Sequence, residues 1–396
     1  MIPEGWREAK IREVAKINVG RDLMEDRFVR TRSETHRFPI YSNTVEQHGH
    51  YGFYDFPEYS AESVTVVGRG IGLGTAFART TPFGAIGRLL VLSPKNRSFD
   101  VSYLADYLNN GFQIHYESGG IPQLPGKTLG NYSILLPPLP EQRRIAEILS
   151  TWDGAIETTQ KLITNARAQK KALMQSLLTG KKRLTGFDGE WENTTLDNAA
   201  QIIVSNVDKK SAEGERAVRL CNYMDVYRTD RIDADMPFMA ATATALQVAR
   251  FALRIGDVLI TKDSETPDDI AVPSYVASTA DDLICGYHLA MIRPKKGTDG
   301  QFLKFYFEHP HTQHFFATRA NGATRFGLTV GAIESAPIHL PPFAEQQLIG
   351  EVIATAELEI ERLKPILATI RYEKSALLQQ LLAGKRRVKI ELEAAA

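Results

Sequence analysis

Three histidines stand close together in the segment H-P-H-T-Q-H, as His309, His311 and His314. Imidazole is a common zinc ligand, and a zinc site usually needs four ligands at tetrahedral geometry. No cysteine lies near this segment, and few acidic residues stand beside it. We therefore expect solvated histidines at a helix end and no metal site.

Paired carboxylates could serve a nuclease, and the sequence contains Asp268-Asp269 and Asp281-Asp282. Neither pair has a lysine at the spacing found in nucleases, so surface charge is the better interpretation. The alternating glycines of GRGIGLG, residues 68–74, do not follow the G-x-G-x-x-G pattern of dinucleotide sites, and no G-x-x-x-x-G-K-[ST] motif is present. The proline pairs in LPPL and LPPF lack the neighbours expected in an amino-methyltransferase. We expect no catalytic residue in this chain, with an enzyme of dispersed site residues as an alternative.

The composition is that of an ordinary globular protein of 396 residues and 44.1 kDa, with 43% hydrophobic residues. Basic and acidic residues both number 47, so any nucleic-acid or membrane site must be a local patch. The two cysteines, Cys221 and Cys285, exclude a disulfide framework. The sequence opens with no signal peptide, and no apolar run reaches the length of a membrane span. We expect a cytoplasmic protein with no membrane partner.

The sequence contains an internal repeat. Residues 137–149 (PPLPEQRRIAEIL) match residues 341–353 (PPFAEQQLIGEVI) at an offset of 204, without a gap as far as Arg183 and Arg387. Similar segments upstream begin at Trp6 and Trp191, at an offset of 185, so the second copy has about nineteen additional residues in its middle. A gapless match of this length indicates duplication. The predicted segments are 1–136, 137–187, 188–340, 341–390 and a tail at 391–396.

Both repeated segments have the pattern of a long coiled-coil helix, because apolar residues recur at alternating spacings of four and three. Proline pairs precede both helices, and Gly180 and Gly384 suit the left-handed residue that ends a helix. A seam about 60 Å long cannot stay exposed, so we expect the helices to pair antiparallel; packing of each helix on its own domain is the alternative. Pro365 should kink the second helix. The predicted seam residues are Ile145, Leu149, Trp152, Ile156, Ile163, Leu173, Leu177, Ile349, Ile353, Ile360, Leu363, Leu367, Leu377 and Leu381.

The two variable regions contain short strand-like runs and a few helical stretches. Each region ends in a glycine-containing segment, 118–127 or 321–327, whose polar side chains could approach a ligand surface. We predict an α/β (α+β) protein with two globular domains, two long antiparallel coiled-coil helices and a pseudo-two-fold internal duplication. The predicted strands are 63–67, 87–92, 133–136, 257–261 and 288–292, and the predicted helices of these regions are 100–110 and 301–309.

Two variable regions, each followed by a helix that opens with PPLPEQ or PPFAEQ and closes with an L-L-x-G-K sequence, resemble the specificity subunit of a Type I restriction–modification system. The resemblance covers essentially the whole chain. In the second variable region, RLCNYMDVY (219–227), GDVLITKDSET (256–266) and GYHL (286–289) are similar to one common type of target recognition domain. In the first, YSN (41–43) and GRG (68–70) are similar to another type.

The resemblance implies that each variable region is a target recognition domain that reads one half of a bipartite target in double-stranded DNA. It implies that the helices set the spacing and dock two methyltransferase (M) subunits, which the restriction (R) motor–nuclease subunits join. S-adenosylmethionine, Mg and ATP are expected only on these partners, and no cofactor on this chain. Ala344 and Ala356 replace Pro140 and Trp152 of the first copy, so the two docking surfaces are expected to differ.

Base readers are expected among polar loop residues, since Arg or Lys recognises guanine and Asn or Gln recognises adenine in the major groove. Arg69, in the glycine-rich loop after a strand, is the leading candidate. The predicted DNA-binding residues are Ser42, Asn43, Arg69, Gln123, Lys127, Lys209, Lys262, Asp263, Ser264, Tyr287, His288, Thr324 and Arg325.

Charge is unevenly distributed, with a net +1 for 1–136, +5 for 137–187, −6 for 188–340 and zero for 341–396. An acidic second region is unusual for a protein that contacts phosphates. We therefore expect weak DNA binding by the isolated chain, with partners supplying phosphate contacts or the acidic residues facing away from DNA. Two alternatives stay open: a stand-alone bipartite DNA-binding regulator, and a coiled-coil protein scaffold without a methyltransferase partner.

Overall fold

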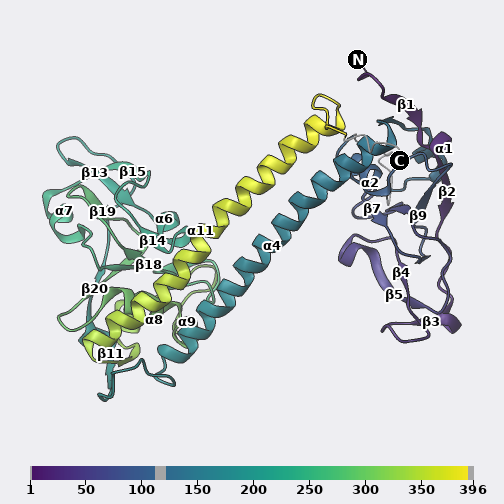
Figure 1. Cartoon of the computed structure of the whole chain (residues 1–396). Helices are drawn as coiled ribbons and strands as arrows, with labels where there is room; N and C mark the ends of the chain where they lie inside the picture. The colour runs from purple at the N-terminus through teal and green to yellow at the C-terminus, as the bar shows by residue number, and fades with distance from the viewer. Residues whose placement is uncertain (1, 112–121, 391–396) are drawn as a thin grey trace. The chain divides into compact units, whose positions relative to one another are not determined.

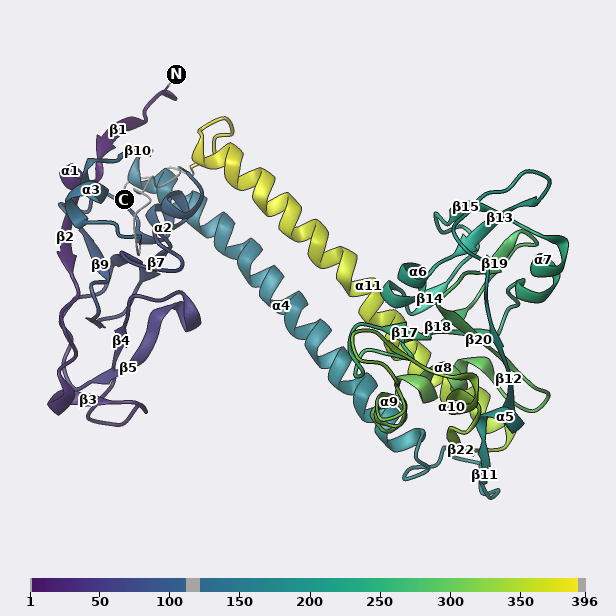
Figure 2. The ribbon, with the colours of Figure 1, turned by 180° about the vertical axis from the view of Figure 1, so that it is seen from behind.

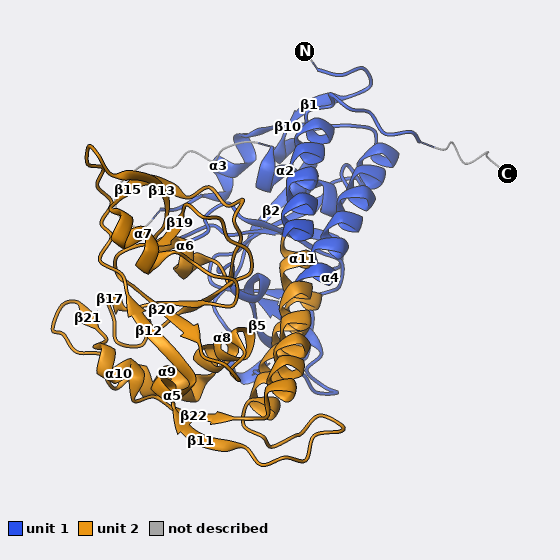
Figure 3. Ribbon diagram, turned by 90° about the vertical axis from the view of Figure 1, so that its left-hand side faces the viewer, with its two compact units in different colours: residues 1–160, 365–396 blue, residues 161–364 orange. Residues whose placement is uncertain are grey.

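The computed structural model describes residues 2–111 and 122–390 (Figure 1). The chain divides into two compact units, Met1–Gln160 with Pro365–Ala396 (unit 1) and Lys161–Lys364 (unit 2) (Figure 3). Two long helices, α4 (Leu139–Leu177) and α11 (Phe343–Leu382), each contribute one half to each unit. The predicted tail at 391–396 and residues 118–121 of the first glycine-containing segment lie outside the described residues.

Unit 1 is built on a four-stranded antiparallel sheet in the order β2-β9-β6-β7, beside a smaller sheet in the order β3-β5-β4-β8. A separate antiparallel pair, β1 and β10, joins the beginning and the end of the first variable region. The strands are β1 (Arg7–Lys10), β2 (Ala15–Val19), β3 (Phe28–Val29), β4 (Phe38–Tyr41), β5 (His50–Tyr54), β6 (Ser63–Val66), β7 (Ala76–Arg79), β8 (Gly84–Ala85), β9 (Leu90–Pro94) and β10 (Ser133–Leu136). The α-helices are α1 (Ile11–Val14), α2 (Val101–Asn110) and α3 (Gly126–Asn131), and the 3-10 helices are η1 (Glu25–Arg27) and η2 (Glu46–Gly49).

Unit 2 repeats this frame. Strands β12-β20-β16-β18 follow the same order as β2-β9-β6-β7, with β14 added at the edge, and β11 pairs with β22 as β1 pairs with β10. A three-stranded sheet, β15-β13-β19, lies in the middle of this region, as the β3-β5-β4-β8 sheet does in unit 1, and the same part of unit 2 also contains two helices (Figure 2). The strands are β11 (Glu192–Thr195), β12 (Ala200–Val204), β13 (Arg216–Cys221), β14 (Arg231–Ile232), β15 (Met239–Ala243), β16 (Val258–Thr261), β17 (Asp263–Ser264), β18 (Pro273–Val276), β19 (Leu283–Cys285), β20 (Leu289–Pro294), β21 (Phe326–Gly327) and β22 (Pro337–Leu340). The helices are α5 (Leu196–Ala199), α6 (Tyr223–Arg228), α7 (Ala245–Phe251), α8 (Gly300–Glu308), α9 (Pro310–Ala317) and α10 (Val330–Glu334).

Helices α2 and α8 are equivalent, and both cover the central sheet of their unit. An aspartate caps each of them: Asp100 accepts hydrogen bonds from the N–H groups of Ser102 and Tyr103, and Asp299 accepts one from Phe302. The buried faces of the two helices join the apolar core of their unit. Each unit therefore buries a core of its own beneath an equivalent helix.

The predicted fold class is confirmed, including two long helices of 39 and 40 residues. The predicted strands and helices of the variable regions all occur, although β9 begins at Leu90 and not at Gly87. Gly87 and Arg88 both have a φ of +66°, which is a turn conformation and not a strand. Gly180 and Gly384 are left-handed, as expected for helix ends, with φ of +66° and +65°. The predicted segment boundaries and the kink at Pro365 stay predictions.

The long helices run antiparallel within each unit. In unit 1, Ile145 and Leu149 near the start of α4 share a core with Leu378 and Leu381 near the end of α11. In unit 2, Leu177 at the end of α4 shares a core with Ile349 and Ile353 near the start of α11. Every predicted seam residue is buried or half-buried, and the same cores contain residues of the sheets and of α2 or α8. The long helices therefore pair with each other and also pack on the variable region of their unit. No helix among the described residues is both long and apolar enough to cross a bilayer.

Candidate nucleic-acid interface

Unit 2 contains a pocket of about 620 Å³ that brings together most of the predicted readers of this region. Helix α6 contributes Tyr223, Met224 and Tyr227, and the remaining residues come from loops and from the short strand β17. Lys262 and Thr324 are neighbours in sequence of residues that line this pocket. The lining residues are Asp208, Lys209, Tyr223, Met224, Tyr227, Asp263, Ser264, Glu265, Thr266, Asp269, Tyr287, His288 and Arg325.

The pairing of β17 with β21 assembles this pocket. Asp263 lies opposite Gly327, and this brings the loop that carries Thr324 and Arg325 beside Asp263. A Cβ atom on residue 327 would lie 2.9 Å from the Asp263 carboxylate, so glycine leaves the space that this side chain needs. The glycine-containing segment 321–327 therefore helps to form the site, as its composition indicated.

Ion pairs and hydrogen bonds hold several of the side chains that line the pocket. Asp263 Oδ2 lies 2.5 Å from His288 Nδ1, and Asp263 Oδ1 lies 3.1 Å from Lys262 Nζ. Tyr227 donates its phenol hydrogen to Asp269 at 2.7 Å, and this bond raises the pKa of Tyr227 above its ordinary value. These contacts fix the orientation of several groups before any ligand arrives.

The rim of the pocket carries charged groups of both signs. The side chains of Lys209, Glu265 and Arg325 are exposed and have no hydrogen-bond or ion-pair partner within the described part of the chain. Tyr287 is exposed, and its ring centroid lies 3.9 Å from that of His288. Ser264, by contrast, is buried and accepts a hydrogen bond from the N–H of Thr266, so it shapes the loop. This mixture of groups complements a ligand that offers hydrogen-bond donors, acceptors and apolar surface. It complements a row of negatively charged phosphates less well.

In unit 1, Asn43, Arg69 and Gln123 of the predicted readers meet at the loop of residues 68–74. The Asn43 amide spans this loop: its Nδ2 donates to the Arg69 carbonyl and its Oδ1 accepts from the Gly68 N–H, both at 2.7 Å. Arg69 forms an isolated backbone bridge with Gln123. The half-exposed guanidinium of Arg69 has no side-chain partner among the residues that the structure describes. Asn43 therefore positions the loop, while Arg69 remains available to a ligand.

The other two predicted readers of unit 1 have different surroundings. Ser42 donates its hydroxyl hydrogen to the Gly49 carbonyl at 3.2 Å, so it stabilises a turn. Lys127 is exposed on α3 and lines a shallow hollow of about 500 Å³ together with Arg12, Lys16 and Lys95. A hollow with four basic side chains is suited to phosphate contacts.

Sequence reasoning did not single out several exposed residues that could contact a ligand. Ile71 is 93% exposed at the tip of the 68–74 loop, and its signal is an isolated apolar residue among alternating glycines. Arg30, Arg32 and Arg37 are exposed beside aromatic rings of the β3-β5-β4-β8 sheet, and their signal is the basic and aromatic sequence RFVRTRSETHRF. Tyr223 and Tyr227 lie one helical turn apart, and their rings stack with centroids 5.7 Å apart. Both belong to the segment RLCNYMDVY, but neither was predicted to contact a ligand.

Equivalent buried carboxylates join each recognition region to the long helices. In unit 1, Glu141 at the start of α4 is 1% exposed as a side chain and accepts hydrogen bonds from Arg387 and Trp6. In unit 2, Glu345 at the start of α11 accepts the same bonds from Arg183 and Trp191. The arginine follows the end of one long helix and the glutamate opens the other. In each unit, a glutamate, an arginine and a tryptophan thus form one hydrogen-bonded cluster, which we call the joint.

The glutamine that follows each of these glutamates completes the joint. Gln142 donates to the Pro137 carbonyl at 2.9 Å and accepts from the Asp100 N–H at 2.8 Å. Gln346 donates to Pro341 at 2.8 Å and accepts from Asp299 at 2.9 Å. The glutamate–glutamine pair of the repeated motif is therefore explained by its contacts with tryptophan, arginine and the main chain.

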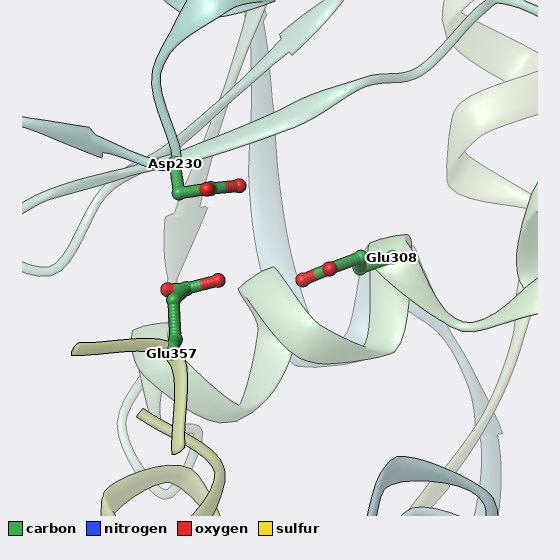
Figure 4. Close-up of side chains that lie close together, drawn as sticks. All are labelled: Asp230, Glu308 and Glu357. Atoms are coloured by element: carbon green, nitrogen blue, oxygen red, sulfur yellow. The ribbon is translucent and has the colours of Figure 1, made fainter. Parts of the chain in front are cut away.

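A partly buried charge cluster lies where α8 of unit 2 meets the long helices (Figure 4). Oxygens of Asp230, Glu308 and Glu357 lie within 4.8 Å of one another, close enough to hold a metal ion. Lys304, with a side chain 1% exposed, contacts all three carboxylates, and Lys170 contacts Glu308 at 2.5 Å and Glu357 at 2.6 Å. Burial lowers the pKa of Lys170, but the two glutamates outweigh it and the net shift is upward. The ammonium groups of Lys170 and Lys304 therefore neutralise the carboxylates, so that the charge of this cluster is balanced without a metal ion.

Several of the other groups considered for chemistry have structural partners. Asp269 accepts from Tyr227, and Asp282 forms an ion pair with Arg219 at 2.8 Å. His309 lies at the start of α9, where its Nδ1 accepts the His311 N–H. Burial raises the pKa of both thiols, Cys221 and Cys285, which makes them poor nucleophiles near neutral pH.

Comparison with known proteins agrees with this architecture. The Type I restriction modification DNA specificity domain matches the chain twice, over residues 3–166 and 190–371. The Type I restriction enzyme MjaVIII specificity subunit of Methanocaldococcus jannaschii is 24% identical over 314 residues, which cover 76% of this chain and 74% of that protein.

Two solved structures share the fold. The S subunit of a Type I restriction-modification system from M. genitalium aligns with a TM-score of 0.65 and 14% identity, over 96% of both chains. A chain from a study of complex assembly and conformational transition of the type I R-M system aligns with a TM-score of 0.54 and 17% identity, over 98% of this chain and 100% of that one. This chain belongs to the family of specificity subunits of Type I restriction-modification systems, and it carries the DNA specificity domain twice.

Proposed function

We propose that this specificity subunit reads a bipartite target in double-stranded DNA, with one half-site contacted by each unit. The observation that carries the proposal is the duplicated joint at Glu141 and Glu345, which attaches two different recognition surfaces to equivalent helix ends. A duplicated frame with divergent loops suits two different half-sites, because the frame holds the loops and the loops meet the bases. The long helices would fix the number of base pairs between the halves.

In each unit, the proposal assigns DNA contact to residues that the sequence predicted. In unit 1, Arg69 would contact a base edge, and the hollow around Lys127 would contact phosphates. In unit 2, the mixed pocket would contact base edges. Its carboxylates explain part of the negative charge of this region, since acidic side chains can accept hydrogen bonds from the amino groups of bases.

The chain itself would perform no catalysis. Two methyltransferase (M) subunits would dock on the long helices and supply S-adenosylmethionine chemistry, and the restriction (R) motor–nuclease subunits would add Mg- and ATP-dependent steps. One of the two solved structures that share the fold comes from work on the assembly of a type I R-M complex, which supports a role in such an assembly. Weak DNA binding by the isolated chain and a cytoplasmic location belong to the same proposal.

The test is to co-express the full chain with the methyltransferase subunit of its own system and to map N6-methyladenine across the host DNA. We expect methylation at one split motif with a fixed gap between two short halves. A stable complex without methylation would refute the assignment of DNA reading. The absence of both complex and methylation would favour the regulator, if the chain alone binds DNA tightly, or the scaffold, if it does not.

A further inference from the structure

His288 lies in the unit 2 pocket with one ring nitrogen fixed. Its Nδ1 is 2.5 Å from Asp263 Oδ2, and an ionised carboxylate can only accept a hydrogen bond. The Nδ1 atom must therefore carry the proton, which leaves Nε2 of the neutral imidazole as an acceptor. The side chain lines the pocket and is about 29% exposed, so a ligand can reach it.

Two further contacts hold this arrangement. Lys262 Nζ lies 3.1 Å from Asp263 Oδ1, so both carboxylate oxygens are engaged, one by a lysine and one by the histidine. The His288 backbone has a φ of +70°, an uncommon conformation for a residue other than glycine. The Lys262 N–H donates to the His288 carbonyl at 3.0 Å and holds this backbone in place. Strained residues of this kind cluster at ligand sites.

We propose that His288 is a specificity-determining residue, whose Nε2 accepts a hydrogen bond from the exocyclic amino group of adenine or cytosine, and that Asp263 positions it by fixing its tautomer. This inference rests on the proposed function. In the major groove, adenine N6 and cytosine N4 are the donors, whereas guanine O6 and N7, thymine O4 and adenine N7 are acceptors. The half-site read by unit 2 should therefore contain an adenine or a cytosine at the base that His288 contacts.

The substitution Asp263→Asn tests the tautomer directly. Lys262 should select the amide oxygen at the position of Oδ1, which turns the amide NH2 toward His288. His288 Nδ1 must then accept, its proton moves to Nε2, and the ring presents a donor to DNA. We expect the preference at one base position to change from adenine or cytosine toward guanine or thymine, with a change in discrimination of about tenfold.

The experiment uses the full chain co-expressed with its methyltransferase subunit and a plasmid library in which either half-site is randomised. N6-methylation is measured for every sequence with the wild type, D263N, H288A and H288Q. The matched control is D282N, which removes a carboxylate charge from the Arg219 ion pair outside the pocket. Thermal melting of each subunit checks folding. The D282N variant should methylate the same motif as the wild type.

The outcomes separate the two proposals. If the wild type marks no split motif, the proposed function fails, and this inference falls with it. If the wild type marks its motif and neither D263N nor H288A changes the specificity of any position, His288 does not read DNA and this inference alone is refuted. Should D263N fail to fold, the comparison of H288Q with H288A decides. The proposal is supported if H288Q, whose side-chain oxygen can accept a hydrogen bond, keeps the preference for adenine or cytosine and H288A relaxes it. Any other pattern would overturn it.

Discussion

Arg387 and Glu141 lie 246 residues apart in the chain and form a bidentate ion pair, with Nε to Oε1 at 2.7 Å and Nη2 to Oε2 at 2.9 Å. Arg183 and Glu345 form the same pair in unit 2, with both distances at 2.6 Å. In each unit, the indole N–H of a tryptophan from the recognition region adds a third hydrogen bond. In each unit, the arginine that follows the end of one long helix thus binds the glutamate at the start of the other long helix.

The two partners of this pair should respond differently to substitution. Among the residues that the structure describes, R387M leaves Trp6 as the one side-chain donor to the buried Glu141 carboxylate, and an unpaired buried charge costs about 3 kcal/mol. E141Q removes the buried charge itself and leaves Arg387 partly in solvent, so we expect a smaller loss. Urea unfolding, with hydrogen exchange followed in residues 139–150, measures both. Arg386 is the exposed control for Arg387, and an equal loss in R386M and R387M would contradict the prediction.

Asp106 should make unit 1 less stable as the pH rises. Burial raises its pKa to about 6, and Asp153 adds to this effect while Lys374 opposes it. The folded state therefore binds more protons than the unfolded state between about pH 4 and pH 6, and the associated stability is lost across that window as the pH increases. D106N should abolish this slope and stabilise unit 1 by about 1–3 kcal/mol at pH 8, with little effect at pH 4. Unfolding midpoints at both pH values test this, with D22N, an exposed site, as the control.

Removal of Lys304 should create a cation site. K304M leaves Asp230, Glu308 and Glu357 with Lys170 as the cation that neutralises them, and because these carboxylates are only partly buried, unit 2 should lose about 1–3 kcal/mol of stability. Three carboxylates at this spacing can coordinate Mn²⁺ or Mg²⁺, and millimolar Mn²⁺ should recover part of the loss. Thermal melting with and without Mn²⁺ measures this. The wild type and K296M, an exposed lysine of the same unit, should not respond, and a K304M variant insensitive to Mn²⁺ would count against the prediction.

R69A and N43D should affect the same half-site by different routes. R69A removes the available guanidinium, and N43D removes the donor to the Arg69 carbonyl, which loosens the loop. We expect each to relax recognition of one half-site by about tenfold and to leave the other half-site unchanged. Methylation of a library randomised in either half distinguishes the two effects. R7A, an exposed arginine of the same unit, is the control, and an equal loss on both halves would refute a local role for the loop.

The fold was accessible from the sequence because its signals are periodic or repeated. The heptad pattern of residues such as Ile145 and Ile349, and the glycines that end the helices, depend on local geometry. The role of Glu141 was not accessible in this way. Its position indicates a favourable charge at a helix start, whereas its arginine partner belongs to a segment 246 residues away. A pattern that depends on long-range contact leaves no periodic signal.

The candidate site was predicted in part. His288, Asp263 and Arg325 were singled out one by one, and the structure brings them together through strands of two residues, which are too short to show a period. Tyr223 was not singled out, because a six-residue helix gives little pattern to analyse. Asn43 was predicted to bind DNA, but its amide is occupied by the loop that it supports. Which of these residues contact DNA stays a prediction.

The joints have a consequence for how this protein can change over time. Gln142 and Gln346 hold their recognition regions through main-chain groups at Asp100 and Asp299, and such groups exist whatever side chains surround them. Besides the apolar residues of α2 and α8 that share a core with the long helices, each region contributes one tryptophan side chain to the joint. Gene segments encoding a recognition region could therefore be exchanged or diverge rapidly while the attachment survives. Under the proposed function, new target specificities would become accessible to evolution without redesign of the frame that carries them.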